Sequence, residues 1–111
     1  MGNRLNRQLI LETPERVGDG AGGYVKSWVA LGSLWAQVSA RAGREAAGVA
    51  APLSRVPYKI IVRAAPTGSD ARPKADQRFR EGTRVYRILS VAEDDLNGQY
   101  LMCTGQEETV A

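Results

Sequence analysis

The sequence contains no histidine and one cysteine, Cys103, among its 111 residues. A zinc site, a Ser-His or Cys-His nucleophile system and a disulfide framework therefore all lack parts that they need. The carboxylates do not cluster, and no acid–base pair or phosphate-binding motif can be assembled from the motifs present. We expect no metal, no cofactor and no enzymatic activity, and we expect Cys103 to be a small buried core residue.

Long hydrophobic runs are also missing, because no stretch approaches the roughly 18 apolar residues of a membrane span. The first residues, MGNRLNRQLI, carry no apolar segment typical of a leader. We expect a soluble, cytosolic product that makes no contact with a membrane. A chain of this length can form one compact domain, residues 1–111, without a large enclosed substrate cavity.

Charge is unevenly distributed along a chain whose net charge is +3. Residues 1–40 carry four basic and three acidic side chains, residues 41–87 carry eleven and four, and residues 88–111 carry none and five. The middle is thus basic and the C-terminal part acidic. Most cations are arginine, which suits ion pairs and phosphate contacts, although GC-rich coding explains the excess equally well.

Alternation of apolar and polar residues predicts strands rather than helices. The expected strands cover residues 5–13, 24–40, 58–65, 84–92 and 99–104. We expect Pro14 to end the first strand, a bulge or bend at Gly32 in the second, and an Asn97-Gly98 hairpin turn between the last two. The glycine-rich residues 17–23 should form a hairpin loop.

The predicted fold class is all-β, a small antiparallel β-barrel of five to six strands with two long loops. OB-like and SH3-like barrels fit the pattern equally well. The long loops are residues 41–56, which are rich in small residues and arginine, and residues 66–77, which are polar. Residues 105–111 are expected to be a mobile or partner-dependent tail.

The order of features resembles the phage head-tail joining proteins, the head-completion or stopper proteins of long-tailed phages and gene transfer agents. The resemblance covers nearly the whole chain and rests on seven pieces in one order. These are Leu5-Asn6-Arg7-Gln8-Leu9-Ile10, Gly22-Gly23-Tyr24 running into Trp28, Leu34-Trp35-Ala36 with Val38, Gly43-Arg44-Glu45, Tyr58-Lys59-Ile60-Ile61-Val62-Arg63, Tyr86-Arg87-Ile88-Leu89 and the hairpin from Asp94 to Leu101. The acidic extension after Cys103 falls outside the family pattern.

The resemblance implies a structural subunit made in the bacterial cytoplasm that forms a ring, expected to be hexameric, at the head–tail interface of a particle. Its partners would be the portal-adaptor connector on the head side, the tail terminator or tail tube on the other, and packaged double-stranded DNA contacted without sequence specificity. The loop at 41–56 would project inward and gate the channel. The channel-loop residues are Arg41, Gly43, Arg44, Glu45, Gly48 and Arg55. A solvated hairpin loop is the competing interpretation.

A basic group and an acidic group are the candidate contacts between subunits or with the connector. The basic group is Lys74, Arg78, Arg80 and Arg84, and the acidic group is Glu107 and Glu108. Alternation would place the last three arginines on one strand face, where a solvated surface is the simpler interpretation. The opposite signs match what a head-to-tail ring contact needs.

Two other functions remain open at this point. A small β-barrel nucleic-acid-binding module could stack bases on Tyr24, Trp28, Trp35 and Tyr58, although aromatic residues on strands are more often core or interface anchors. A tail-terminator protein is the second alternative, because terminators are also rich in β-structure.

Overall fold

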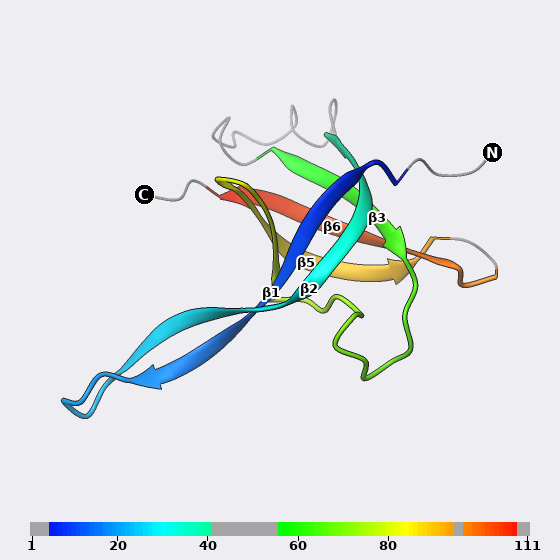
Figure 1. The fold of residues 1–111 in the computed structure, drawn as a ribbon. Coiled ribbons are helices and arrows are strands. Elements are labelled where there is room, and N and C mark those ends of the chain that lie inside the picture. The colour runs from blue at the N-terminus through cyan, green and yellow to red at the C-terminus, as the bar shows by residue number, and fades with distance from the viewer. Residues whose placement is uncertain (1–4, 41–55, 95–96, 109–111) are drawn as a thin grey trace.

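The computed structural model describes residues 5–40, 56–94 and 97–108 of the chain. These residues form six antiparallel strands, joined edge to edge in the order β1-β2-β3-β6-β5-β4 and closed into one ring-like sheet (Figure 1). The strands are β1 (Arg7–Gly18), β2 (Tyr24–Ala40), β3 (Pro57–Arg63), β4 (Arg78–Glu81), β5 (Arg84–Glu93) and β6 (Tyr100–Glu108). The all-β barrel prediction is confirmed. None of the described residues forms a helix that could span a bilayer.

Each predicted strand is present, and β4 is the one strand that the pattern missed. This strand is four residues long and contributes one apolar side chain, Phe79, to the core. Four residues are too few for a period of two to be recognised. β4 nevertheless closes the barrel, because it pairs with β1 on one side and β5 on the other.

The prediction that Pro14 ends the first strand is wrong, since β1 continues to Gly18 and Pro14 pairs with Trp28 of β2. On its other side β1 pairs with β4 only from Ile10 to Glu12. Proline lacks an N–H group and is tolerated in a strand whose second edge has no partner. Pro14 lies just where that edge becomes open.

The predicted irregularity at Gly32 is confirmed as a shift in strand register. Leu11 pairs with Gly32 but Glu12 pairs with Ala30, so β2 has one extra residue at this point. The φ angle of Gly32 is positive, in the region that favours glycine. The bulge bends β2 where it passes from the barrel wall into the part that leaves the barrel.

The prediction of a tail from residue 105 is wrong for Gly105–Glu108, which belong to β6. Gly105 pairs with both Tyr58 and Ile88, and Glu107 pairs with Tyr86. Between two neighbouring strands the backbone hydrogen bonds hold even a polar sequence in extended form. The prediction failed because these residues show little apolar alternation.

The core lies inside the barrel and is lined by one face of every strand. Its fully buried members are Leu9, Leu11, Ala36, Ile60, Val62, Phe79, Tyr86, Ile88, Leu101 and Cys103. The buried residues of β1 (Leu9 and Leu11) and of β3 (Ile60 and Val62) alternate along each strand, so one face of each strand points inward. Burial of these side chains is the main force that closes the sheet.

A two-stranded ribbon projects from the barrel and extends one side of the molecule (Figure 1). We call residues 13–30 the arm; it consists of the end of β1, the beginning of β2 and the loop between them. The Asp19 carboxylate accepts hydrogen bonds from the backbone N–H groups of Ala21 and Gly23, at 2.8 and 3.0 Å. These bonds lower the pKa of Asp19. The tip of the arm is therefore an ordered turn.

Candidate assembly interface

One end of the barrel is filled by a polar network. Arg7 of β1 makes a two-point ion pair with Glu81 of β4, in which its Nε lies 3.0 Å from Oε2. Arg84 of β5 binds Glu107 of β6 in the same way, with its Nε 2.8 Å from Oε2 and its second nitrogen 3.2 Å from Oε1. The network thus ties β1 to β4, which is 74 residues away in the sequence, and β5 to β6.

Two tyrosines complete this network from the side of the core. Arg84 donates to the Tyr58 hydroxyl at 3.2 Å and Arg7 to the Tyr86 hydroxyl at 3.4 Å. The two rings meet edge to face, with centroids 5.1 Å apart. The polar end is thus packed directly on aromatic residues of the core.

The ion pairs change the pKa values of their members. Hydrogen bonding from Arg7 lowers the pKa of Glu81, and hydrogen bonding from Arg84 lowers that of Glu107. Both arginines have raised pKa values because of the same bonds. All four groups are therefore charged at neutral pH and support one another.

A second cluster lies on the outer face of the barrel, where the arm begins. Glu12 is only 4% exposed, and Arg78 Nε lies 2.6 Å from its Oε1. Arg80 Nε lies 3.1 Å from Oε2 in a geometry that makes an ion pair but no hydrogen bond. The Arg78 guanidinium also covers the ring of Trp28, 4.1 Å from its centroid. This cluster fixes the base of the arm to β4.

The predicted single face for Arg78, Arg80 and Arg84 is wrong. A two-residue turn, Gly82-Thr83, separates β4 from β5, so Arg84 pairs with Glu81 rather than continuing the β4 alternation. The φ angle of Gly82 is positive, as the first residue of such a turn requires. Arg78 and Arg80 consequently face outward with Glu12, while Arg84 joins the network at the barrel end.

The other predicted contact residues are spread over the surface. Lys74 is exposed in the segment that connects β3 to β4. Glu108 lines an open polar cleft of about 410 Å³, whose further walls come from the arm, from β5 and from the segment before β4. Those walls are Pro14, Lys26, Trp28, Asp76 and Arg87. The basic and acidic groups therefore meet within the described chain only at Arg84 and Glu107, and their contacts with other subunits remain a prediction.

The channel-loop residues all lie outside the described part of the chain. They are Arg41, Gly43, Arg44, Glu45, Gly48 and Arg55. The structure places the loop's two ends, since β2 ends at Ala40 and β3 begins at Pro57, and these strands pair through Ala40 and Tyr58. Gating by this loop remains a prediction.

The strand pattern did not predict that residues 13–30 project from the barrel as an arm. Several of its large apolar side chains are exposed, among them Val17 at 43%, Tyr24 at 65% and Val25 at 54%. Exposed apolar groups gathered on one projection are typical of an interaction surface. The sign in the sequence was the unusual length of the second predicted strand, residues 24–40. The first predicted strand, residues 5–13, was too short to pair with all of it.

The aromatic residues divide into two groups that the strand pattern did not separate. Tyr58 is half-buried on the core and Trp28 is half-buried under Arg78, as expected for anchors. Tyr24 and Trp35 are exposed, Trp35 at 55%. Cys103 is fully buried, and burial raises its pKa to about 12, so the expectation of a buried core residue is confirmed.

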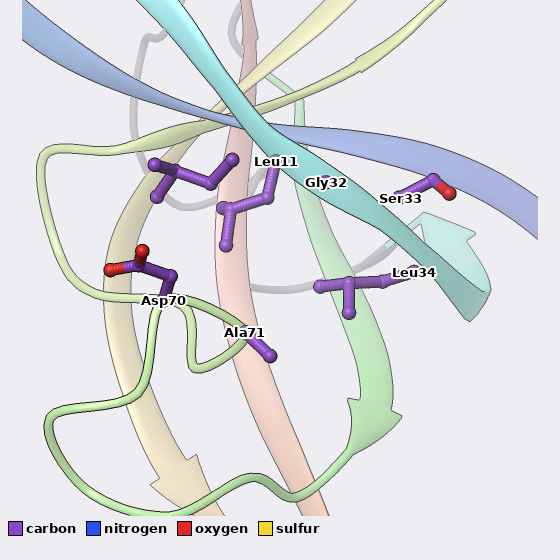
Figure 2. Close-up of a pocket in the computed structure, with 7 residues that line it drawn as sticks. Leu11, Gly32, Ser33, Leu34, Asp70 and Ala71 are labelled. Atoms are coloured by element: carbon purple, nitrogen blue, oxygen red, sulfur yellow. The ribbon is translucent and has the colours of Figure 1, made fainter.

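A small apolar pocket lies beneath the bulge, between β2 and the segment that connects β3 to β4. Figure 2 shows the side chains of Leu11 and Leu34 converging near Ala71 and Asp70. Its volume of about 50 Å³ is too small for an organic substrate. Among the described residues no group of Cys, Asp or Glu side chains could hold a metal ion.

The fold and these surfaces define a small β-barrel protein that presents a projecting hairpin and arginine–carboxylate clusters. The sequence matches the phage head completion proteins over residues 2–108. The chain therefore belongs to this family of structural particle proteins, which gives it a structural role in joining head and tail.

Two solved structures are similar over nearly their whole length. A chain in the structure titled as the virion of a native gene transfer agent particle is 54% identical, with a TM-score of 0.80, covering 99% of this chain and 100% of that one. Protein SF1141 from Shigella flexneri 2a is 21% identical with a TM-score of 0.70, covering 97% and 96%, and shares the fold. A search of curated proteins finds no match.

Proposed function

We propose that this protein is a stopper: a ring of identical copies, expected to be hexameric, that completes the DNA-filled head and joins it to the tail. The ring would dock on the portal-adaptor connector and offer its other side to the tail terminator or tail tube. Packaged double-stranded DNA would be held in the channel until ejection. The mechanism is mechanical and electrostatic, without a chemical step.

The observation that carries this proposal is the family match over residues 2–108, together with 54% identity to a chain of a gene transfer agent virion. Identity at this level across 99% of the chain supports an equivalent role in a similar particle. The closed barrel supports it as well, because all six strands are paired within one subunit. Copies would therefore contact one another through side chains and through the arm, and not by pairing strands of two barrels.

The proposed gate is the segment at residues 41–56. Its glycines and alanines would let several copies crowd around an axis. Arg41, Arg44 and Arg55 would contact phosphates without reading sequence. Since β2 and β3 hold both ends of this segment on the barrel wall, its displacement need not disturb the core.

The basic and acidic surface groups are proposed contacts with neighbours. Arg80 and Lys74 keep exposed charge that an acidic neighbour could pair, and Glu108 lies open on the cleft. Arg84 and Glu107 already bind each other, so we propose that they hold the barrel end in the shape that a neighbour meets.

The test is electron microscopy of particles made when the gene is deleted from its native producer, with packaged DNA quantified in parallel. We expect tailless heads that have lost their DNA, next to separate finished tails. Complementation with the wild-type gene should restore intact particles.

Two other results would overturn the stopper assignment. Full heads with overlong or unfinished tails would move the protein to the tail side as a terminator. Normal particles would exclude a joining role and favour the nucleic-acid-binding module, which should then bind single-stranded oligonucleotides with strong salt dependence.

A further inference from the structure

One face of the arm carries an ordered row of cations and aromatic rings. Arg16 lies over the ring of Tyr24, 4.6 Å from its centroid, and Lys26 lies 5.4 Å from the centroid of Trp28. Arg16 pairs directly with Lys26 across the ribbon. Two like charges are thus held side by side, in a position that favours an acidic partner.

These two cations make none of the ion pairs found within the described chain. Those ion pairs involve Arg7, Arg78, Arg80, Arg84 and Arg87 instead. Arg16 and Lys26 are exposed on a ribbon that leaves the barrel. Their rings orient them but leave their charge accessible to a partner.

The end of β5 carries side chains of the opposite charge. Glu93 and Asp94 are exposed, and none of the described ion pairs involves either of them. Residues 88–108, which contain β6 and most of β5, include no basic side chain. The end of β5 therefore presents acidic side chains without an ion-pair partner among the described residues. The cation at the same end of the sheet, Arg63 of β3, lies instead over the ring of Tyr100, 5.8 Å from its centroid.

The arm and the acidic end of β5 lie at opposite sides of the molecule, so they cannot meet within one chain (Figure 1). We infer that the arm of one copy docks on the acidic end of β5 in a second copy of this chain, with Arg16 and Lys26 facing Glu93 and Asp94. Such a contact joins one patch on the first copy to a different patch on the second, so the same contact can repeat from copy to copy around a ring. The inference rests on the proposed function, because it needs copies side by side.

The size of the arm explains why the contact would need the assembled particle. The ribbon spans roughly 20 Å, with strands about 5 Å apart. One of its faces buries far less than the ~800 Å² per partner of a stable interface. A single arm would not hold a free dimer, whereas a closed ring engages every arm at once.

Charge exchange tests the contact. The arm variant carries Arg16→Glu and Lys26→Glu, and the β5 variant carries Glu93→Lys and Asp94→Lys. Each should reduce DNA-filled, tailed particles by roughly tenfold or more, because like charges then face each other in every subunit contact. The four changes together should restore particles towards the wild-type number, and failure to restore them would overturn the inference.

The matched control is Glu15→Lys, which changes an exposed charge on the opposite face of the same ribbon. It should leave particle number unchanged. Each purified variant should melt at nearly the wild-type temperature, so that a loss of particles reflects contact rather than folding.

A crosslink gives an independent result. A chain with Lys26→Cys and Asp94→Cys should form disulfide-linked multimers in particles, while the native Cys103 thiol is buried and does not compete. Monomers alone would contradict the inference.

If gene deletion leaves particles normal, the proposed function fails. If deletion abolishes particles but both charge variants assemble, only the arm contact fails.

Discussion

Glu12 shows how a single residue can connect two parts of the molecule. Its carboxylate is almost fully buried on the outer wall and contacts the guanidinium groups of Arg78 and Arg80. Arg78 in turn covers Trp28 at the base of the arm. Removing this one charge should therefore loosen both β4 and the arm.

We expect Glu12→Gln to lower the free energy of unfolding by about 1–3 kcal/mol, because two arginines lose their carboxylate in a mostly buried place. Urea unfolding followed by circular dichroism measures this. Glu15→Gln changes an exposed residue three positions further along the same strand. That substitution should alter the free energy of unfolding by at most about 0.5 kcal/mol. Equal effects of the two substitutions would show that the cluster contributes no stability.

The barrel-end ion pairs predict a pH dependence. Glu81 and Glu107 have folded-state pKa values below the ordinary 4.5, so their stabilisation is complete above that value and is lost as pH falls through the lowered values. Each pair is partly exposed and should contribute less than about 1 kcal/mol. When the pH is lowered from neutral to acidic, the urea concentration at the unfolding midpoint should therefore decrease more for the wild type than for a Glu81→Gln, Glu107→Gln variant. Parallel curves for the two proteins would refute this.

The sequence identified buried residues better than it identified ion pairs. Leu9, Ile60 and Cys103 are buried as their positions in alternating strands predict. The partners of Arg7 and Arg84 could not be predicted, because each depends on which strands are neighbours and in which register. Arg7 alternates with the buried Leu9 and Leu11 along β1, but the residue pattern alone does not show which carboxylate it meets.

Among the elements, β2 depends on a local backbone feature, the bulge at Gly32. Its positive φ is one that other residues rarely adopt, although no atom lies near enough to obstruct a side chain. Gly32→Ala should therefore cost about 1–3 kcal/mol through backbone strain alone.

Thermal unfolding tests this prediction against a matched control. Gly18 also has open space around it but lacks a positive φ. Gly18→Ala should therefore change stability by no more than about 0.5 kcal/mol. If Gly32→Ala is as stable as Gly18→Ala, the bulge imposes no strain.

Element boundaries follow from neighbours as much as from sequence. β6 extends through Glu108 because β3 and β5 flank it, and β1 passes Pro14 because one of its edges has no partner there. Neither neighbour relationship is visible in the local pattern. The bulge and the glycine-rich turn of the arm were predictable, since they depend on residues with special backbone freedom.

At the scale of the whole molecule, the closed sheet and the arm have different roles. Around the barrel each of the six strands forms backbone hydrogen bonds with its neighbours, so the barrel has no open strand edge. The outer halves of β1 and β2, which form the arm, are exposed. The all-β class was predictable from alternation, whereas the barrel's completion by β4 and the projection of the arm were not. Both depend on long-range pairing.

The measurement that tests the central claim most directly is a cryo-electron microscopy reconstruction of the head–tail region of the native particle. We predict a ring of identical copies of this barrel around the DNA channel, between the head connector and the tail, with residues 41–56 directed towards the axis. Each arm should reach the acidic end of β5 in the next copy. A reconstruction in which that position lacks this chain, or in which the copies do not form a ring, would contradict the account.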